Sequence, residues 1–557
     1  MRKRFTPLFI LLFSAIILAG QDLSNIKQQK PFGISGGLSL GSYLYGANGI
    51  PSRQAPFGYS VNANATLSFY GLSVPFSVVF NEQGRRFQQP FNRYGLSPTW
   101  KWGKIHLGHR NLNLSPFTLA GQTMYMAGLE LTPGKLRFAA ATGRFYNAVG
   151  SGDPNFQRPR FKRSALALKL GAGGKNGGFF DVIFLKGKDD INSLPNEPDS
   201  VRAKLKAQEN AVIGLSFKQP FAKQKLTLQF DGAASTFTED LRFEPIDFSQ
   251  KAPQVENIGF IIQPNGSSHI NYALESSLRW ESQRFGLAAT YRRVMPEYKS
   301  MGVNYLLTDI EAITLNPSLI LGAGKTVVSG SIGLERNNLD QHKSEDTRRT
   351  IGSLDLSMNP SPVFGFFAQY SNYTVQQQVF REEFSNDSIL INQINHNFTL
   401  APRYTILGSS VQHTLLLTLN YQILDDQNQF TAEFTENDLV NVILTYMASF
   451  PGTGMNIRGS LNHFRFSSGQ FENSRKGFTA GLNKKFGESG LTLGSDVTFS
   501  SINQQHSTGT NITASALLDF AFGKRNSISL QVYYLKNNLP SFGFSEVRGQ
   551  ARYNYRF

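Results

Sequence analysis

The chain has 557 residues, with 55 Lys and Arg against 39 Asp and Glu, and it contains no cysteine. The absence of cysteine excludes a disulfide scaffold, cysteine-ligated zinc, iron–sulfur clusters and thiol catalysis. A hydrophobic content of 40% excludes a disordered chain, and no run of about 18 apolar residues beyond the N-terminal stretch could cross a membrane as a helix.

Residues 1–20 have the pattern of a secretory signal peptide. Basic residues at 2–4 precede an apolar stretch at 8–18, and small residues follow at 19–20. This order predicts export across the inner membrane and cleavage, which would lower the formal charge from +16 to +13. The alternative is an N-terminal membrane anchor. The remaining chain divides into a short N-terminal lead at 21–31 and one domain at 32–557.

The dominant pattern after residue 31 is alternation of apolar and polar residues with period two, which predicts β-strands. In the last segment, apolar and aromatic residues occupy the odd positions from 547 to 557, and arginines share the opposite face. Short glycine-rich turns, such as 322–325 and 486–490, separate the segments. Longer polar stretches lie between them at about 189–208, 240–268, 296–309, 378–392 and 425–437. Short turns at one end and long loops at the other are typical of outer-membrane barrels.

We count about 26 candidate strands between Phe32 and Phe557, and such barrels have an even number of strands. The sequence therefore predicts an all-β fold, a transmembrane antiparallel β-barrel of about 22–26 strands with no plug domain. The sheet must close because an unpaired backbone group in lipid costs several kcal/mol. The alternative, a soluble array of β-sandwiches or a propeller, accounts for the alternation but not for the hairpin asymmetry. One short helix is expected within the loop segment 199–210.

Motifs associated with catalysis or metal binding fit the strand pattern better than they fit a site. Two overlapping G-x-S-x-G patterns, at 33–37 and 37–41, lie inside one strand, whereas a nucleophile elbow requires a strand, a turn and a helix. The GAGKT sequence at 322–326 lacks the first glycine of a phosphate-binding loop and precedes a strand. His106 and His109 are three apart and point to opposite faces of a strand. We therefore predict no catalytic residues, no metal site, no cofactor and no enzymatic activity.

Trp100 and Trp102 flank Lys101 shortly before a predicted turn. Aromatic side chains near strand ends are favoured at the membrane–water interface, so we interpret the pair as part of an aromatic girdle. The alternative is a platform on which a carbohydrate stacks.

Two segments resemble known outer-membrane proteins. The final sequence YNYRF resembles the terminal strand of bacterial outer-membrane barrels, in which a closing Phe is read by the barrel-assembly machinery; the resemblance implies that Tyr553, Tyr555 and Phe557 form an assembly signal. Residues 91–147, including FNRYGLSPTWKWGKIHLGHRNLNLSPFTLAGQTMYMAGLEL, resemble a segment of large, uncharacterised outer-membrane proteins of Bacteroidota-type bacteria. The resemblance implies an outer-membrane location in a Gram-negative cell and the barrel fold, with no activity to carry over.

Basic residues recur on the predicted non-lipid faces of the strands. The candidate solute contacts in the lumen are Lys104, Arg279, Arg292, Arg458, Arg548, Arg552 and Arg556. Fixed cations facing water raise the local anion concentration, so they favour anions. Two alternatives are open: pairing with the acidic residues Glu275, Glu281, Asp355, Asp496 and Asp519, or binding of lipopolysaccharide phosphates by basic residues outside the hydrocarbon band. The basic residues are dispersed, which argues against nucleic acid as a partner.

These features predict a passive channel for small hydrophilic solutes, with anionic or sugar-like ones favoured. Loops 189–208 and 240–268 are the expected candidates to narrow the lumen. The alternative function is a structural barrel that serves a membrane-protein partner in a secretion, motility or assembly complex. The expected surroundings are outer-membrane lipid and lipopolysaccharide, with the barrel-assembly machinery as a partner during biogenesis.

Overall fold

The computed structural model describes residues 31–70, 72–81, 93–152, 158–174, 177–194, 197–246, 262–379, 390–469, 471–505, 507–539 and 542–557. The predicted signal peptide at 1–20, and all of the lead at 21–31 except Pro31, lie outside the described residues.

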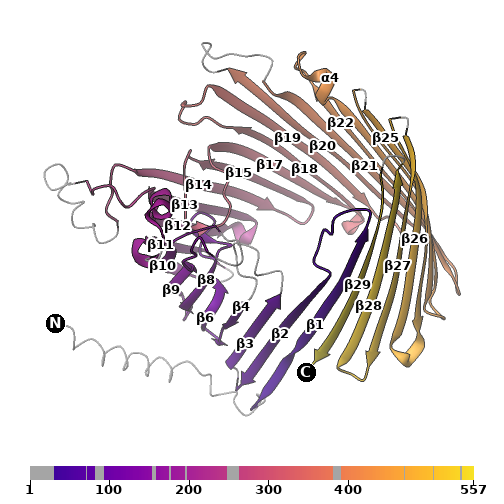
Figure 1. Ribbon diagram of the computed structural model, residues 1–557. Coiled ribbons are helices and arrows are strands. Elements are labelled where there is room, and N and C mark those ends of the chain that lie inside the picture. The colour runs from indigo at the N-terminus through magenta and orange to yellow at the C-terminus, as the bar shows by residue number, and fades with distance from the viewer. Residues whose placement is uncertain are drawn as a thin grey trace.

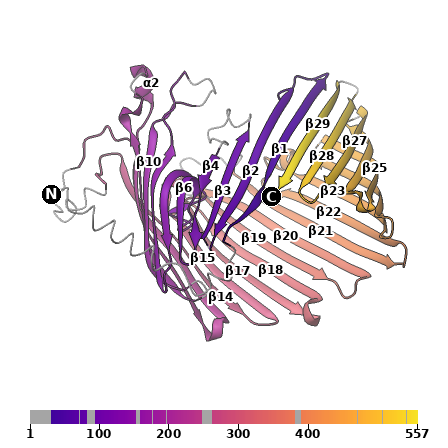
Figure 2. The same cartoon turned by 90° about the horizontal axis from the view of Figure 1, so that it is seen from below.

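The fold consists almost entirely of long antiparallel strands (Figures 1 and 2). The first half comprises β1 (Gly33–Asn48), β2 (Phe57–Phe69), β3 (Leu72–Asn81), β4 (Arg93–Leu96), β5 (Thr99–Trp100), β6 (Gly103–Asn111), β7 (Leu119–Ala120), β8 (Thr123–Leu131), β9 (Leu136–Tyr146), β10 (Lys162–Gly173), β11 (Phe179–Asp190), β12 (Glu209–Phe221), β13 (Leu226–Thr238), β14 (Ser268–Glu281), β15 (Phe285–Val294) and β16 (Gly302–Val303). The second half comprises β17 (Ile310–Leu321), β18 (Thr326–Arg336), β19 (Glu345–Met358), β20 (Phe364–Val379), β21 (Asn392–Leu407), β22 (Gln412–Asp426), β23 (Asn437–Phe450), β24 (Met455–Ser468), β25 (Phe471–Phe486), β26 (Leu491–Gln504), β27 (Ser507–Phe522), β28 (Asn526–Leu539) and β29 (Phe542–Arg556).

All strands except β7 and β16 form one sheet that closes on itself. The sheet holds 27 strands, and both β4 and β5 pair with β3 on one side and β6 on the other. These two short strands share one position in the wall, so the barrel has 26 positions. The predicted closed antiparallel barrel and its strand number are thereby confirmed. Closure leaves no free sheet edge, which is the condition for a β-structure in lipid.

The alternation predicted from the sequence matches the two faces of the wall. Paired residues in neighbouring strands share a face, so the register assigns each side chain to the inside or the outside. In β2, Ser60, Asn62 and Asn64 face inward, while Phe57 and Tyr59 lie on the outside with about half of their surface exposed. The outer face is thus apolar and the inner face polar over this part of the wall.

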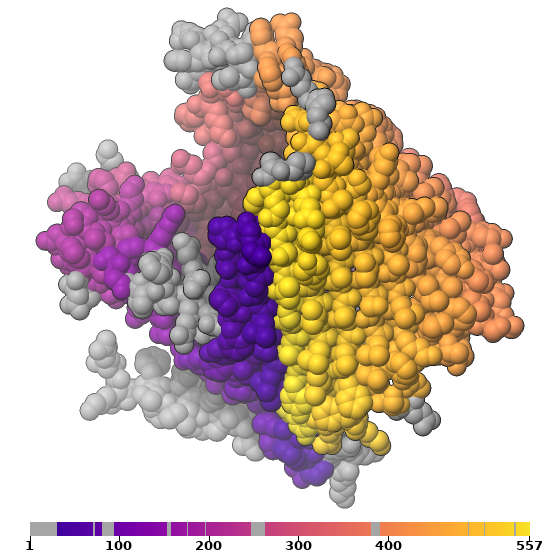
Figure 3. Space-filling model, turned by 45° about the vertical axis from the view of Figure 1, so that its right-hand side comes forward, coloured from indigo at the N-terminus to yellow at the C-terminus, as the bar shows by residue number. Residues whose placement is uncertain are grey.

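The seam between the first and last strands completes the barrel. The register runs from Gly37 opposite Arg556 to Asn48 opposite Ser545, and backbone hydrogen bonds of 3.1 Å link Gly36 and Phe557 in both directions. In the space-filling view, indigo β1 lies directly against the yellow last strands (Figure 3).

Replacing Phe557 with Ala is expected to reduce the amount of assembled barrel while leaving the backbone pairing of the seam possible. The Phe557 ring lies 5.9 Å from that of Tyr555, and its loss removes the terminal aromatic side chain but no backbone group. The measurement is the heat-modifiable fraction in the outer membrane. Phe520→Ala is the matched control, because Phe520 forms a comparable ring pair with Phe522 at 5.6 Å on β27. Equal losses in both variants would contradict a special assembly role.

The ends of the barrel differ as predicted. Turns such as 322–325 and 487–490 are tight, whereas the opposite end carries long connections. In the first of these turns, Ala323 adopts a positive φ of 56°. The long-loop end also has tight connections between β24 and β25, β26 and β27, and β28 and β29, so the asymmetry does not extend around the whole barrel. The helix expected within 199–210 is present as α2 (Asp199–Lys204), and a second short helix, α4 (Ala432–Thr435), was not predicted.

Two connections fold into the barrel, residues 112–122 and 295–309; we call them the inward segments. Their side chains Phe117, Leu119 and Tyr298 are at most 1% exposed and belong to one apolar cluster with inner-face residues of the wall. That wall surface is Met124, Met126, Ala139, Ala141, Phe145, Ala165, Ala167, Ile183, Leu185, Val212, Ala233, Phe237, Ala273, Val294 and Ile310. The core of the molecule therefore lies inside the barrel, against strands β8 to β17.

Hydrogen bonds join the inward segments to each other and to the wall. The Tyr298 hydroxyl donates to the carbonyl of Phe117 at 2.7 Å, and the segments pair through the short parallel strands β7 and β16. Burial raises the pKa of the Tyr298 phenol, which keeps it protonated as a donor. The fully buried side chain of Asn210 accepts from the amide of Met301 at 3.0 Å and donates to Ser235 Oγ at 2.8 Å.

Glycines on the inner wall make room for this packing. A Cβ atom on Gly187 would lie 2.7 Å from the sulfur of Met301, and one on Gly214 would lie 2.5 Å from a methyl group of Thr118. A larger residue at either position would push the inward segments off the wall.

The segments that the structure shows inside the barrel are 112–122 and 295–309. The expectation that loop 189–208 narrows the lumen is therefore wrong for its described part, whereas the expectation for loop 240–268 stays a prediction. The described part of 189–208 forms a 3-10 turn (Ile191–Ser193) and α2, which projects beyond the end of β10 (Figure 2). Residues 247–261 of the other loop lie outside the described residues. The physical difference is composition: the inward segments carry large apolar side chains opposite a wall of alanine and glycine, whereas 189–208 is rich in charge.

Candidate functional site: the inner wall of the barrel

All seven predicted basic residues lie on the inner face. The register pairs Lys104 with Glu130, Arg292 with Glu275 and Arg458 with Met447, each on the inside. It also places Arg548, Arg552 and Arg556 opposite Tyr45, Gly41 and Gly37, on the small-residue face of β1. Whether any of them contacts a solute stays a prediction.

Four of the seven have carboxylate partners on the same wall. Lys104 lies 4.0 Å from Glu130, Arg279 lies 3.3 Å from Glu281, Arg292 lies 3.6 Å from Glu275, and Arg458 lies 2.6 Å from Asp496. Three of these acids, Glu275, Glu281 and Asp496, were among the partners considered from the sequence. Arg279 and Glu281 pair within one strand, and the other three pairs join nearby strands, so these four basic residues add little net charge to the lumen.

Glycine lets opposite charges meet where they lie two strands apart. Arg458 and Asp496 lie two strands apart in one row of the register, with Gly481 between them. A Cβ atom on Gly481 would lie 2.1 Å from Asp496 Oδ1, so the missing side chain is what lets the two charges meet. The same arrangement recurs where Arg137 meets Asp181 at 2.7 Å across Gly171.

The remaining three form a ladder of cations along β29, which we call the arginine ladder: Arg548, Arg552 and Arg556. Within the described ranges, none has a carboxylate within 4.0 Å. Asp519 shares a row with Arg552, but Ser529 stands between them where the paired rows have glycine. Successive members lie four residues apart, about 14 Å along the strand. The space-filling view shows a hollow behind indigo β1, the strand that pairs with β29 (Figure 3).

A buried network that the sequence did not reveal lies on the wall, at β6 and β8. His106, 2% exposed, lies with Nε2 2.6 Å from Glu130 and with Nδ1 3.3 Å from the hydroxyl of Ser97. Serine, histidine and glutamate also make up acyl-transfer triads. Ser97 is 4% exposed, however, so its hydroxyl is closed off by packing, and we interpret the trio as a hydrogen-bond chain that satisfies buried groups. Only the three-dimensional register brings Ser97 and Glu130 to the histidine.

The motifs that were set aside as structural behave as expected. The G-x-S-x-G patterns lie within strand β1, and 322–324 forms a turn followed by β18. His106 faces inward, while the His109 ring makes an edge-to-face contact with the outer residue Tyr94 at 5.1 Å between ring centroids. The rings of Trp100 and Trp102 meet at 5.5 Å beside the turn between β5 and β6; their place in an interfacial girdle stays a prediction.

No helix among the described residues has the length and apolarity needed to cross a membrane. Within the same residues, no three His, Cys, Asp or Glu side chains gather into a group that could hold a metal ion.

Comparisons with known proteins add a likeness of fold at very low identity. No protein-family model matches the chain, and no curated protein matches it. Among solved structures, OccAB2 of Acinetobacter baumannii is 10% identical, covers 71% of this chain and 98% of its own, and has a TM-score of 0.31. The ferric preacinetobactin receptor BauA of the same organism is 10% identical over 93% of this chain and 80% of its own, with a TM-score of 0.37. The translocation pore of the P pilus usher PapC is 10% identical over 94% and 99%, with a TM-score of 0.34. These scores are too low to support an argument about function.

Proposed function

We propose that the protein is an outer-membrane channel through which small hydrophilic solutes diffuse, with anions favoured. The observation that carries the proposal is the inner wall beyond the inward segments. From β18 through β29 to β2, inward positions are dominated by Ser, Thr, Asn and Gln, and the arginine ladder stands on this wall without carboxylate partners among the described residues. Such a surface favours water and anions over cations.

The outer face supports the location. Side chains such as Leu44, Leu461 and Ile332 point outward with 60% or more of their surface exposed. In water a closed barrel with this many exposed apolar side chains would aggregate, whereas lipid satisfies them. The tight turns would lie on the periplasmic side and the long loops outside. Outer-membrane lipid and lipopolysaccharide would then surround the barrel, which the assembly machinery would insert.

The purified barrel is expected to give stepwise conductance in planar bilayers, with reversal potentials that show anion preference. The reason is the set of inner-face arginines that have no carboxylate within 4.0 Å in the described part of the chain. Heat-modifiable mobility on a gel serves as the control for folding and closure. A barrel that folds and inserts but carries no current would contradict the channel.

A second candidate is a structural barrel that serves a membrane-protein partner. It is favoured by exposed aromatic side chains at the long-loop end: Phe430 is 54% exposed and Phe434 on α4 is 75% exposed. Affinity isolation in mild detergent would recover a stoichiometric large partner, and replacing both residues with Ser should release it. A lone barrel in that experiment would argue against this candidate.

A further inference from the structure

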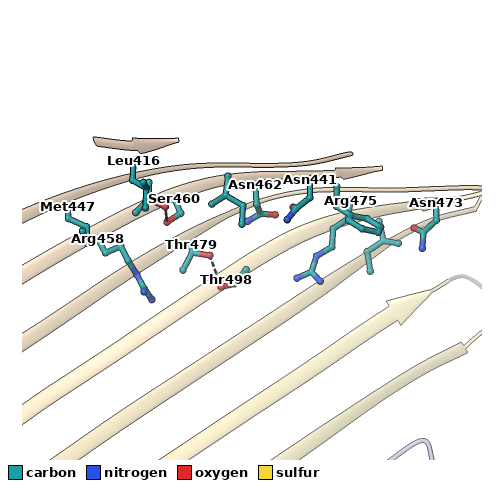
Figure 4. A pocket seen from close by; sticks show the side chains of 14 residues that line it. Leu416, Asn441, Met447, Arg458, Ser460, Asn462, Asn473, Arg475, Thr479 and Thr498 are labelled. Atoms are coloured by element: carbon teal, nitrogen blue, oxygen red, sulfur yellow. Dashed lines mark hydrogen bonds between the residues drawn. The ribbon is translucent and has the colours of Figure 1, made fainter. Parts of the chain in front are cut away.

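A hollow of about 910 Å³ lies on the inner wall formed by β22 to β26 (Figure 4). It lies away from the inward segments, on the polar side of the lumen. Its floor mixes three asparagines, Asn441, Asn462 and Asn473, with apolar side chains, and two arginines rise from it, Arg458 and Arg475.

The two arginines differ in charge balance. Arg458 is neutralised by Asp496 at 2.6 Å. Arg475 has no carboxylate within 4.0 Å in the described chain, and its row offers none, because Phe464 and Ile502 are its partners in the neighbouring strands. The hollow therefore contains one uncompensated positive charge set between an aromatic ring and an aliphatic side chain.

Two buried polar atoms at this place lack partners. The Nε of Arg475 and the hydroxyl of Ser500 are both buried and make no hydrogen bond to any described residue. Ser500 lies beside Gly477, where a Cβ atom would approach its hydroxyl to 2.5 Å and Asn462 Oδ1 to 3.0 Å. The absence of a side chain on Gly477 thus lets these two polar side chains occupy the space where a Cβ atom would lie. Buried groups without partners are uncommon in folded proteins and indicate a missing ligand or water.

We propose that this hollow binds an acidic sugar of the hexuronate type as it passes through the channel. The carboxylate would pair with Arg475, whose planar guanidinium matches a carboxylate geometrically. Each asparagine amide has both donors and an acceptor, as vicinal hydroxyls require. The C–H face of the sugar ring would lie on Phe464. A phosphate has no apolar face, and a simple aromatic acid has too few hydroxyls for three amides. The proposal rests on the channel function and names its solute class.

The test measures interruptions of the single-channel current of the full chain by added galacturonate, galactose and acetate. Galacturonate is expected to produce longer interruptions than the other two. In Arg475→Gln the residence time should fall about tenfold or more, because a charge-assisted pair is lost. Asn462→Ala should shorten it less. Arg465→Gln is the matched control, since Arg465 lies on the outer face of β24, paired with Glu472 at 3.2 Å, and should change nothing.

Three outcomes would overturn the site while leaving the channel intact: equal interruptions by galactose, equal interruptions by acetate, or no effect of Arg475→Gln in a conducting barrel. Failure of the channel would show instead as absent conductance. In that case titration calorimetry of the detergent-solubilised barrel with galacturonate still decides about the site, and no heat of binding would overturn it.

Discussion

Replacing the arginine ladder with glutamine should reduce the anion preference of the channel about tenfold. For an ion that passes about 6 Å from one of these guanidinium groups, the fixed charge contributes about 0.7 kcal/mol in a water-like dielectric. That energy enriches an anion and depletes a cation about threefold each. The variant Arg548→Gln, Arg552→Gln and Arg556→Gln removes these charges while keeping polar side chains that can donate hydrogen bonds. The measurement is the reversal potential in a salt gradient.

The matched control removes an ion pair from the same lumen without changing its charge. Arg458→Gln combined with Asp496→Asn deletes the pair across Gly481, so selectivity should stay near that of the parent. The effect of the ladder should also depend on salt: the Debye length is about 30 Å at 0.01 M and about 3 Å at 1 M. The three arginines of the ladder are about 14 Å apart, so their electric fields would overlap only at low salt. A ladder variant that folds, conducts and keeps its full anion preference would rule out this source of selectivity.

The inward and outward faces of the barrel wall could be predicted from the sequence, because the alternation of polar and apolar residues is a local pattern within each strand. Alternation along one strand decides which side chains share a face, so Arg548 and its two ladder neighbours could be placed inside before any pairing was known. Turn residues decided the ends of the strands in the same local way. The charge balance was harder to predict, because it depends on register across strands. Arg458 meets Asp496 only because Gly481 falls between them, whereas Ser529 occupies the equivalent place beside Arg552.

The inward segments were missed because alternation gives the face of a side chain and not what lies against it. A signal was nevertheless present. Ala139, Ala141, Ala165 and Ala167 are small residues at inward positions of neighbouring strands. A lumen wall in contact with water has no reason to prefer alanine over serine or asparagine. A run of small apolar residues on the inner face therefore indicates that a segment of the chain packs there, and Phe117 lies in the connection that precedes β8.

Replacing the second inward segment, residues 295–309, with a two-residue turn should widen the channel. It should also destabilise the part of the barrel against which that segment packs. Val294 and Ile310 are register partners, so residues 295–309 are inserted between two positions that already pair, and Asn-Gly can join them in a tight hairpin. Conductance should rise because the lumen loses this filling. Tyr298 and Met301 leave the core, at about 1.5–3 kcal/mol for each buried side chain. Single-channel current measures the first effect. The temperature at which the barrel loses the gel mobility of its folded form measures the second.

The control for this variant shortens a connection at the rim. Residues 425–436 lie between Leu424 and Asn437, which are also register partners, so the same turn can replace them without altering the core. A point substitution gives independent evidence: Gly302→Val would bring a side chain against the carbonyl of Thr118, 2.3 Å from its Cβ, and Gly352→Val meets nothing within 4 Å. Gly302→Val should therefore raise conductance and lower stability in the same direction as the replacement. If both core variants conduct like the parent while the 112–122 segment becomes open to protease, the inward segments support the wall but do not limit the flow of solute.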